Sequence, residues 1–170
     1  MPNIQKIIET KFLNSPSQLQ VARVLLKYGL SVKKNNAYCG GMRVAAAEIA
    51  RKAGVDRRVA ILTLSVISKD KELSSIFAAL SPIAYLKDAA LSLGQDVIEI
   101  IPQDASKPGI VSDVTRVISD AGVSIRQVIT EDSHLSEEAS MTIITDSKIS
   151  GGLIDKIRRL EHVKNVTIYK

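Results

Sequence analysis

The chain has 170 residues, of which 45% are hydrophobic and 24% charged, a composition typical of a globular protein of one or two small domains. Aromatic residues make up only 4% and tryptophan is absent, which disfavours a platform of stacked rings for single-stranded nucleic acid. The charge is uneven: residues 1–94 hold 14 basic and 6 acidic side chains, whereas residues 95–170 hold 9 and 12. This predicts a basic module that meets a polyanion, joined to a mildly acidic module, with chance surface composition as the alternative.

Neither a signal peptide nor a membrane span is expected. The first twenty residues contain scattered polar groups, and the longest apolar run, 59–68, is about half the length that a bilayer requires. A single cysteine, Cys39, excludes an intramolecular disulfide and a zinc site built from cysteines. We therefore expect a cytoplasmic protein with no membrane partner.

Residues 1–94 are predicted to form an all-α domain. Apolar stripes indicate a helix near residues 4–8 and a second helix that starts at Pro16 and ends at Gly29, whereas the turn-rich segment 35–41 is expected to be a loop. A helix over 44–53, a turn at Gly54 and a helix over 57–68 capped by Asp56 give a helix-turn-helix-like outline. Two short helices follow, with Pro82 between them, and we place the domain boundary at Gly94.

Residues 95–170 are predicted to form a ferredoxin-like βαββαβ domain, so the fold class of the chain is α+β. Strands are expected over 97–102, 123–132, 138–146 and 163–169. One helix runs from Ile110 to Gly122, and the other begins at Gly151. Both helices lie on one face of an antiparallel sheet in this arrangement, which leaves the other face uncovered unless a partner covers it.

The turn between the first predicted strand and its helix has the features of an anion site. Pro108 presets the backbone at the helix entry, and Gly109 lacks the side chain that would block close approach to the free backbone amides. A phosphate loop would require more glycines and a Lys-Ser or Lys-Thr pair, so a carboxylate fits better. The alternative is that Pro108-Gly109 is simply a tight turn.

These residues carry a resemblance to a known family. The predicted strand at 97–102, the turn Pro108-Gly109-Ile110, the helix that follows and the remaining elements to residue 170 resemble the amino-acid-binding ACT domain. The whole chain is similar to predicted archaeal regulators of amino-acid metabolism that join a helix-turn-helix region to a C-terminal ACT domain. The segments "EIARKAGVDRRV" (48–59) and "IFAALSPIAYLKDAALSLGQDVIEI" (76–100) carry this second resemblance.

The resemblance implies an amino-acid effector bound between two copies of the chain, as a homodimer or a higher homo-oligomer. The turn of one subunit would face the second strand of its neighbour. The implied ligand-binding residues are Asp104, Ser106, Pro108, Gly109, Ile110, Val123, Ser124 and Ile125. Many ligand-binding members have an acidic or amide residue where this chain has Ser106, and an asparagine where it has Ser124, and Asp104 is the residue that would substitute.

DNA is a second possible partner, through the basic residues of the N-terminal domain. The implied DNA-binding residues are Arg43, Arg51, Lys52, Arg57, Arg58 and Lys69. The helix that begins at Arg57 is apolar on most sides, which leaves only Arg57, Arg58, Thr63, Ser65 and Ser68 to contact DNA. The alternative is that the basic residues form a solvated surface.

Catalytic and metal-binding patterns are not found. His134 and His162 are far apart in sequence, and Cys39 has no histidine nearby, so we expect no metal site, no cofactor and no enzymatic activity. Two functions remain. The first is a dimeric, ligand-responsive transcriptional regulator of amino-acid metabolism. The second is a module that docks on a metabolic enzyme and transmits amino-acid status, which an exposed apolar surface on 59–67 would favour.

Overall fold

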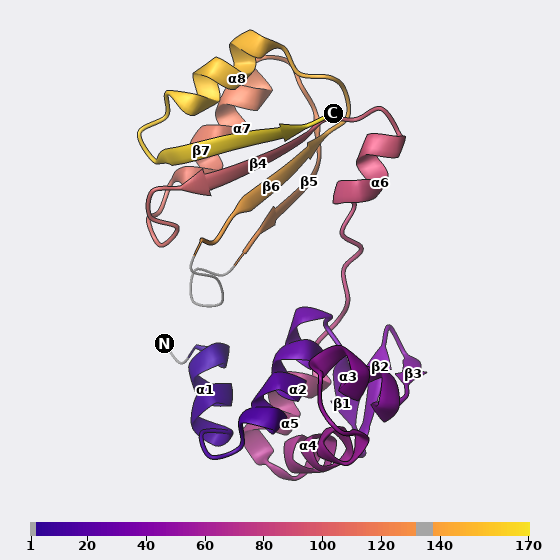
Figure 1. Cartoon of the computed structure of the whole chain (residues 1–170). Helices are drawn as coiled ribbons and strands as arrows, with labels where there is room; N and C mark the ends of the chain where they lie inside the picture. The colour runs from indigo at the N-terminus through magenta and orange to yellow at the C-terminus, as the bar shows by residue number, and fades with distance from the viewer. Residues whose placement is uncertain (1–2, 132–137) are drawn as a thin grey trace. The chain divides into compact units, whose positions relative to one another are not determined.

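The structure is a computed structural model that describes residues 3–131 and 138–170. The chain divides into two compact units, Met1–Ala84 and Tyr85–Lys170, each with its own hydrophobic core (Figure 1). Among the described residues, no helix combines the length and the apolar character needed to cross a membrane.

The N-terminal unit contains five helices among its described residues. They are α1 (Ile4–Lys11), α2 (Pro16–Lys27), α3 (Ala46–Ala53), α4 (Arg57–Lys69) and α5 (Lys71–Ala78). Their apolar stripes meet in an aliphatic core whose largest fully buried side chains include Phe12, Leu25 and Phe77. The helices therefore follow the predicted stripes, and Pro16 starts α2 as expected.

The prediction that this unit is all-α was wrong. A small antiparallel sheet, β1 (Ser31–Lys33), β2 (Asn36–Cys39) and β3 (Met42–Val44), occupies the segment expected to be a loop. Two-residue turns join its strands, and all four turn residues have positive φ: Lys34, Asn35, Gly40 and Gly41. Turns of this kind match the twist of short hairpins, which explains why so short a segment forms a sheet.

The turn between α3 and α4 has the predicted geometry. Gly54 ends α3 in the left-handed conformation with φ +66°, and the side chain of Asp56 accepts a hydrogen bond from the backbone N–H of Arg58 at the start of α4. The arrangement is two helices joined by a short turn.

The C-terminal unit has the predicted βαββαβ order, preceded by one extra helix. Its elements are α6 (Lys87–Ser92), β4 (Val97–Pro102), α7 (Ile110–Asp120), β5 (Ile125–Thr130), β6 (Met141–Thr145), α8 (Gly151–Arg158) and β7 (Val163–Tyr169). The strands form one antiparallel sheet in the order β5-β6-β4-β7. The ferredoxin-like α+β prediction is therefore confirmed in its topology. The turn expected between the second and third predicted strands, residues 133–137, lies outside the described residues, as does Asp132 at the end of the second predicted strand.

Alternate residues of the sheet face α7 and α8. Ile98 and Ile100 of β4 and Ile143 of β6 pack in one core with Val114 and Ile118 of α7 and with the apolar face of α8, which contributes Leu153, Ile154 and Ile157. Both helices thus cover the same face, as Figure 1 shows.

The other face of the sheet is not bare, which corrects the expectation that only a partner could cover it. α6 lies against it, and Ala90 packs in a small cluster with Val97 and Ile144. Because α6 packs on β4 and β6, it belongs to the C-terminal unit. The division between the units therefore comes before α6, at Ala84, and not at Gly94.

Candidate ligand-binding site

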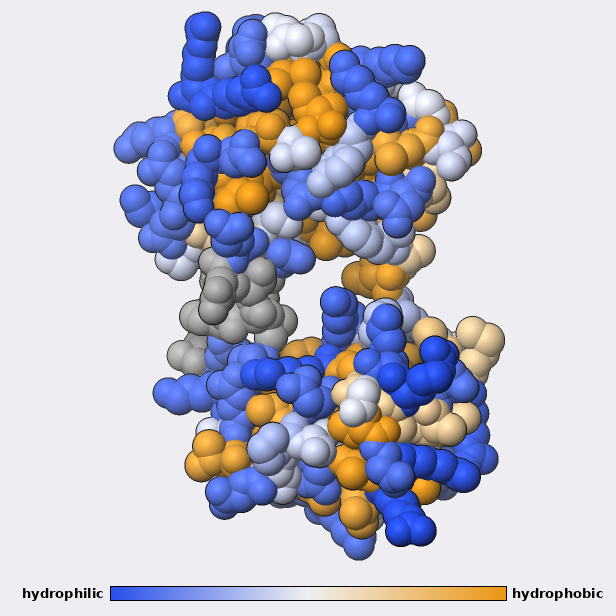
Figure 2. Space-filling view, viewed as in Figure 1, coloured by the Kyte–Doolittle hydropathy of each residue, from blue (hydrophilic) through white to orange (hydrophobic). Residues whose placement is uncertain are grey.

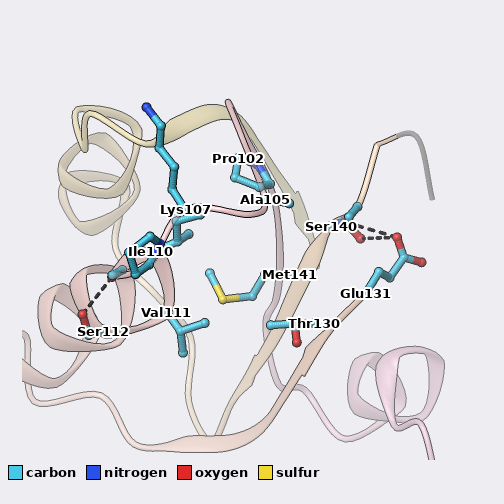
Figure 3. Close-up of a pocket in the computed structure, with 13 residues that line it drawn as sticks. Pro102, Ala105, Lys107, Ile110, Val111, Ser112, Thr130, Glu131, Ser140 and Met141 are labelled. Carbon is cyan, nitrogen blue, oxygen red and sulfur yellow. Dashed lines mark hydrogen bonds between the residues drawn. The ribbon is translucent and has the colours of Figure 1, made fainter. Parts of the chain in front are cut away.

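A cavity of about 640 Å³ opens at the turn between β4 and α7 (Figure 3). One wall is the turn itself with the first residues of α7, which include Pro108, Gly109 and Ile110. The opposite wall comes from the ends of β5 and β6. The cavity therefore lies where three segments meet that are far apart in the sequence.

The turn holds its backbone in a form suited to glycine. Gly109, the residue before α7, has φ +99°, and no side chain caps the helix. The first N–H that bonds back to this turn is that of Asp113, which donates to the carbonyl oxygen of Gly109. The N–H groups of the three residues between them lack intrahelical acceptors, as in any first helical turn. They border the cavity and carry the positive end of the helix dipole.

The opposite wall is apolar near its centre and polar at its rim. Met141 lies in the middle of the view, with Thr130 beside it. The carboxylate of Glu131 sits at the rim, where its Oε2 atom accepts hydrogen bonds from the backbone N–H of Ser140 at 3.1 Å and from the Ser140 hydroxyl at 3.3 Å. Lys107 occupies the other side of the opening. The cavity thus combines an apolar floor with charged groups at opposite sides of its mouth.

Asp104 and Ser106 do not line this cavity. The Oδ1 atom of Asp104 accepts hydrogen bonds from the backbone N–H of Ser106 at 3.0 Å and from the Ser106 hydroxyl at 2.6 Å. These hydrogen bonds, with the hydroxyl bond the larger cause, lower the pKa of Asp104. The pair stabilises the turn before Pro108, and the carboxylate that lines the cavity is that of Glu131.

Val123, Ser124 and Ile125 line a different hollow, of about 430 Å³, along α7 and the start of β5. Thr115, Arg116 and Ser119 complete it. Ser112 borders both hollows. Within one chain, the predicted residues are therefore divided: the turn faces the end of β5 at Thr130, whereas Val123, Ser124 and Ile125 at the start of β5 line the other hollow.

Residues 105–162 match the ACT domain family. The chain contains an ACT domain. The matched segment runs from the turn at the cavity to the residue before β7, so it includes most residues of both hollows. β4 precedes the matched segment, but it pairs with β6 and β7 in the same sheet. No curated protein sequence matches the chain.

Two solved structures resemble the whole chain weakly. The crystal structure of PH0061 is 16% identical with a TM-score of 0.28, and the match covers 89% of this chain and 88% of that one. An AsnC family transcriptional regulator from Agrobacterium tumefaciens is 10% identical with a TM-score of 0.30, and the match covers 90% of this chain and 86% of that one. At such scores neither likeness indicates what this chain binds.

The basic residues of the N-terminal unit differ in their surroundings. Arg51 forms an ion pair with Glu48 at 2.6 Å, and the ammonium group of Lys52 lies 5.5 Å from the centre of the Tyr28 ring. Arg57 and Arg58 are exposed at the start of α4 and form no ion pair with a described residue. Arg43 on β3 and Lys69 at the end of α4 are also exposed.

The outer face of α4 is mostly apolar. Ile61, Leu62 and Val66 are 47%, 57% and 39% exposed, and apolar residues reach the surface in Figure 2 in the region where Figure 1 places α4. Thr63, which the sequence left available to DNA, is fully buried, and its hydroxyl donates to the carbonyl oxygen of Val59. Only the two ends of α4 therefore carry exposed cationic groups.

Lys107, Thr130, Glu131, Ser140 and Met141 also line the cavity, although the sequence did not predict them there. Lys107 could have been found, because it lies within the Pro-Gly turn. The other four reach the cavity only through the pairing of β5 with β6, whose register sets Thr130 opposite Met141. His134 lies outside the described residues. Cys39 is half-buried on β2.

Proposed function

We propose that this protein is a ligand-responsive regulator of amino-acid metabolism, whose ACT domain binds a small amino acid in the cavity at Gly109. The observation that supports this proposal most directly is the cavity itself. It combines uncapped backbone amides at the start of α7, an apolar floor at Met141 and a carboxylate at Glu131. These three features complement the three parts of an α-amino acid.

In the proposed complex, the ligand carboxylate lies at the first turn of α7, where Gly109 permits close approach. The side chain lies on the apolar surface of Ile110, Val111 and Met141. The ammonium group is directed to the rim, toward Glu131, whose Oε1 atom is not used in the bonds to Ser140. This orientation favours an aliphatic amino acid over an acidic one, because Glu131 would repel a second carboxylate.

We further propose that the effector binds in a homodimer or higher homo-oligomer formed through the ACT domain. β5 is an edge strand of the sheet, and the hollow lined by Val123, Ser124 and Ile125 lies beside it. A second copy paired at this edge would contribute those residues to the site. Asp104 and Ser106 support the turn rather than contact the ligand in this arrangement.

For the N-terminal unit we propose contact with DNA in the cytoplasm, and no catalytic role. The helices α3 and α4 would present Arg57 and Arg58 to the phosphates or bases, with Arg43, Arg51, Lys52 and Lys69 as additional cations near the backbone. An effector would alter DNA affinity only if it prefers one arrangement of the paired copies.

The test combines two measurements on the full chain. A thermal-shift screen of the common amino acids identifies the effector, because a ligand that binds only the folded protein raises its Tm. Gel-shift titration against genomic fragments, with and without that amino acid, then measures DNA binding and its response. The sensor half fails if no amino acid raises the Tm, and the transcriptional half fails if no fragment binds even at low salt.

A second candidate, docking on a metabolic enzyme, is favoured by the exposed face of α4. Ile61, Leu62 and Val66 offer an apolar contact surface that is unusual for a helix that reads DNA. Affinity purification from native extract, with and without nuclease, separates the alternatives. Stoichiometric recovery of one enzyme that survives nuclease treatment and is lost in a Leu62→Asp variant would support docking, whereas retention that nuclease abolishes would support DNA.

A further inference from the structure

The second face of the sheet in the C-terminal unit holds residues Tyr85–Ser92, which we call the strap. The hydroxyl of Tyr85 lies 2.9 Å from Oγ1 of Thr142 on β6. The next residue, Leu86, donates its backbone N–H to Oε1 of Gln127 on β5 at 3.1 Å. The first part of the strap is therefore fixed to two strands by hydrogen bonds.

Lys87 fixes the strap to the other two strands. Its ammonium group pairs with Oε2 of Glu99 on β4 and lies 4.2 Å from the centre of the Tyr169 ring on β7. The Tyr169 hydroxyl also donates to Glu99, at 2.9 Å. Together with Ala90, these contacts cross the whole width of the sheet.

The cavity and the strap depend on the same three strands. On β6, Met141 lines the cavity and the adjacent Thr142 contacts the strap. On β4, Pro102 lines the cavity and Glu99 binds Lys87, three residues away. On β5, Thr130 and Gln127 have the same relation. A shift of these strands at the cavity therefore moves Thr142, Glu99 and Gln127, the residues that the strap contacts, because close-packed interiors transmit strain.

Apart from these polar contacts, the strap buries little of its own surface. α6 has only six residues, far below the length at which an isolated helix is stable in water, so its helical form depends on the sheet beneath it. Ala90 is the one residue of α6 that is fully buried, whereas Tyr85 and Leu86 are 53% and 41% exposed. Such a segment belongs to the part of a fold that opens locally at low cost.

We propose that the strap is a relay: occupancy of the cavity at Gly109 changes how firmly Tyr85–Ser92 is held on the sheet, and with it the free length of chain between the units. The part of this proposal that concerns the ligand rests on the proposed function. Release of Tyr85–Ser92 would lengthen the tether to residues 1–84 by roughly 25–30 Å at full extension. In a dimer, a longer tether lowers the effective concentration at which the second N-terminal unit meets its half of a two-fold DNA site once the first unit is bound.

Hydrogen exchange of the full chain tests the relay. Lys87→Met removes the ammonium group but keeps an apolar stem that can still contact Tyr169. The matched control is Lys11→Met, which removes an ion pair of similar exposure with Asp70 in the other unit. We expect the backbone N–H of Ala90 to exchange about fivefold faster in Lys87→Met only. At the cavity wall, the backbone N–H of Glu131 donates to the carbonyl oxygen of Ser140, and the Ser140 N–H donates to the Glu131 carboxylate; we also expect both N–H groups to exchange faster.

The outcomes distinguish the relay from the sensor. The relay is overturned if Ala90 exchanges at the same rate in Lys87→Met as in the wild type. It is also overturned if exchange is faster at Ala90 but unchanged at Glu131 and Ser140. A pool of the common amino acids is then added to the wild-type chain, where slower exchange of the strap is expected. If the pool raises the Tm but leaves strap exchange unchanged, the relay is wrong and the sensor stands. If the pool has no effect on the Tm, the sensor is wrong, and the variant alone decides whether strap and cavity are coupled.

Discussion

Replacing Gly109 with alanine probes the turn on which the candidate site depends. At φ +99° a residue with a Cβ atom is strained by about 1–2 kcal/mol. Steric overlap adds little, because the nearest described atom to the new Cβ would be Oδ2 of Asp113, at 3.9 Å. For a unit of this size the strain lowers the Tm by roughly 5–15 °C. The Cβ would also stand beside the free amides, so we expect at least about a tenfold loss of amino-acid affinity.

Gly122→Ala is the matched control, at the other end of the same helix. Gly122 has φ +71° and no described atom within 4 Å of an added Cβ, so its replacement carries a similar strain but lies outside the cavity. Differential scanning calorimetry measures the stability of both variants, and isothermal titration with the amino acid found by thermal shift measures the affinity. The role proposed for Gly109 is refuted if Gly109→Ala is as stable as the wild type, or if Gly122→Ala weakens binding equally.

Three further substitutions test the cavity rim, the strap and the basic surface. Glu131→Gln should weaken amino-acid binding by about tenfold in the same titration, whereas Glu138→Gln, which breaks only an exposed pair with Lys164, should not. Glu99→Gln tests the strap pair. The hydrogen bond from Lys87, and then that from Tyr169, lowers the pKa of Glu99 from its ordinary 4.5, so the pair stabilises the fold above pH 4.5 and this contribution is lost as the pH falls through the lowered value. Urea unfolding should show the variant about 1 kcal/mol less stable at neutral pH and the difference vanishing in acid; a difference that persists in acid contradicts this assignment. If the N-terminal unit binds DNA, the double substitution Arg57→Ala and Arg58→Ala should reduce the slope of log affinity against log salt by about 2, as measured by fluorescence anisotropy. Arg51→Ala should change the slope less, because Arg51 is already paired with Glu48.

The C-terminal domain was predictable because its elements are long enough to show their periods. α7 carries Ile110, Val114 and Ile118 on one stripe, and β4 alternates buried and half-buried residues from Ile98 to Pro102. Gly122 marks the end of α7 within two residues. Elements of this length are set by local patterns, and tertiary packing only adjusts their ends.

The N-terminal sheet was missed for the opposite reason. Strands of three or four residues, such as β1, are too short to show a period of two. Gly40-Gly41 was a turn signal that could have indicated a hairpin. The other turn uses Lys34 and Asn35 at positive φ, and it is held in place by a hydrogen bond from the Asn35 backbone N–H to the Ser68 hydroxyl of α4. That hydrogen bond joins residues that are far apart in the chain, so the local sequence gives no signal for it.

The position of α6 was also beyond the sequence. The segment was correctly expected to be helical, but its attachment depends on Glu99 and Tyr169, which are distant in the chain. The same limit applies to the candidate site. Pro108 and Gly109 made one wall of the cavity predictable, whereas Glu131 and Met141 are brought to the cavity by the pairing of β5 with β6.

Coverage of the second sheet face by the strap changes where a second copy can bind. A partner stacked on that face would have to displace Tyr85 and Lys87 from their contacts with Thr142 and Glu99. The sheet edge formed by β5 requires no such displacement, and it lies beside the hollow of Val123–Ile125. Association at that edge would bring the residues of the two hollows together, so an effector bound as proposed and association should strengthen each other to the same extent.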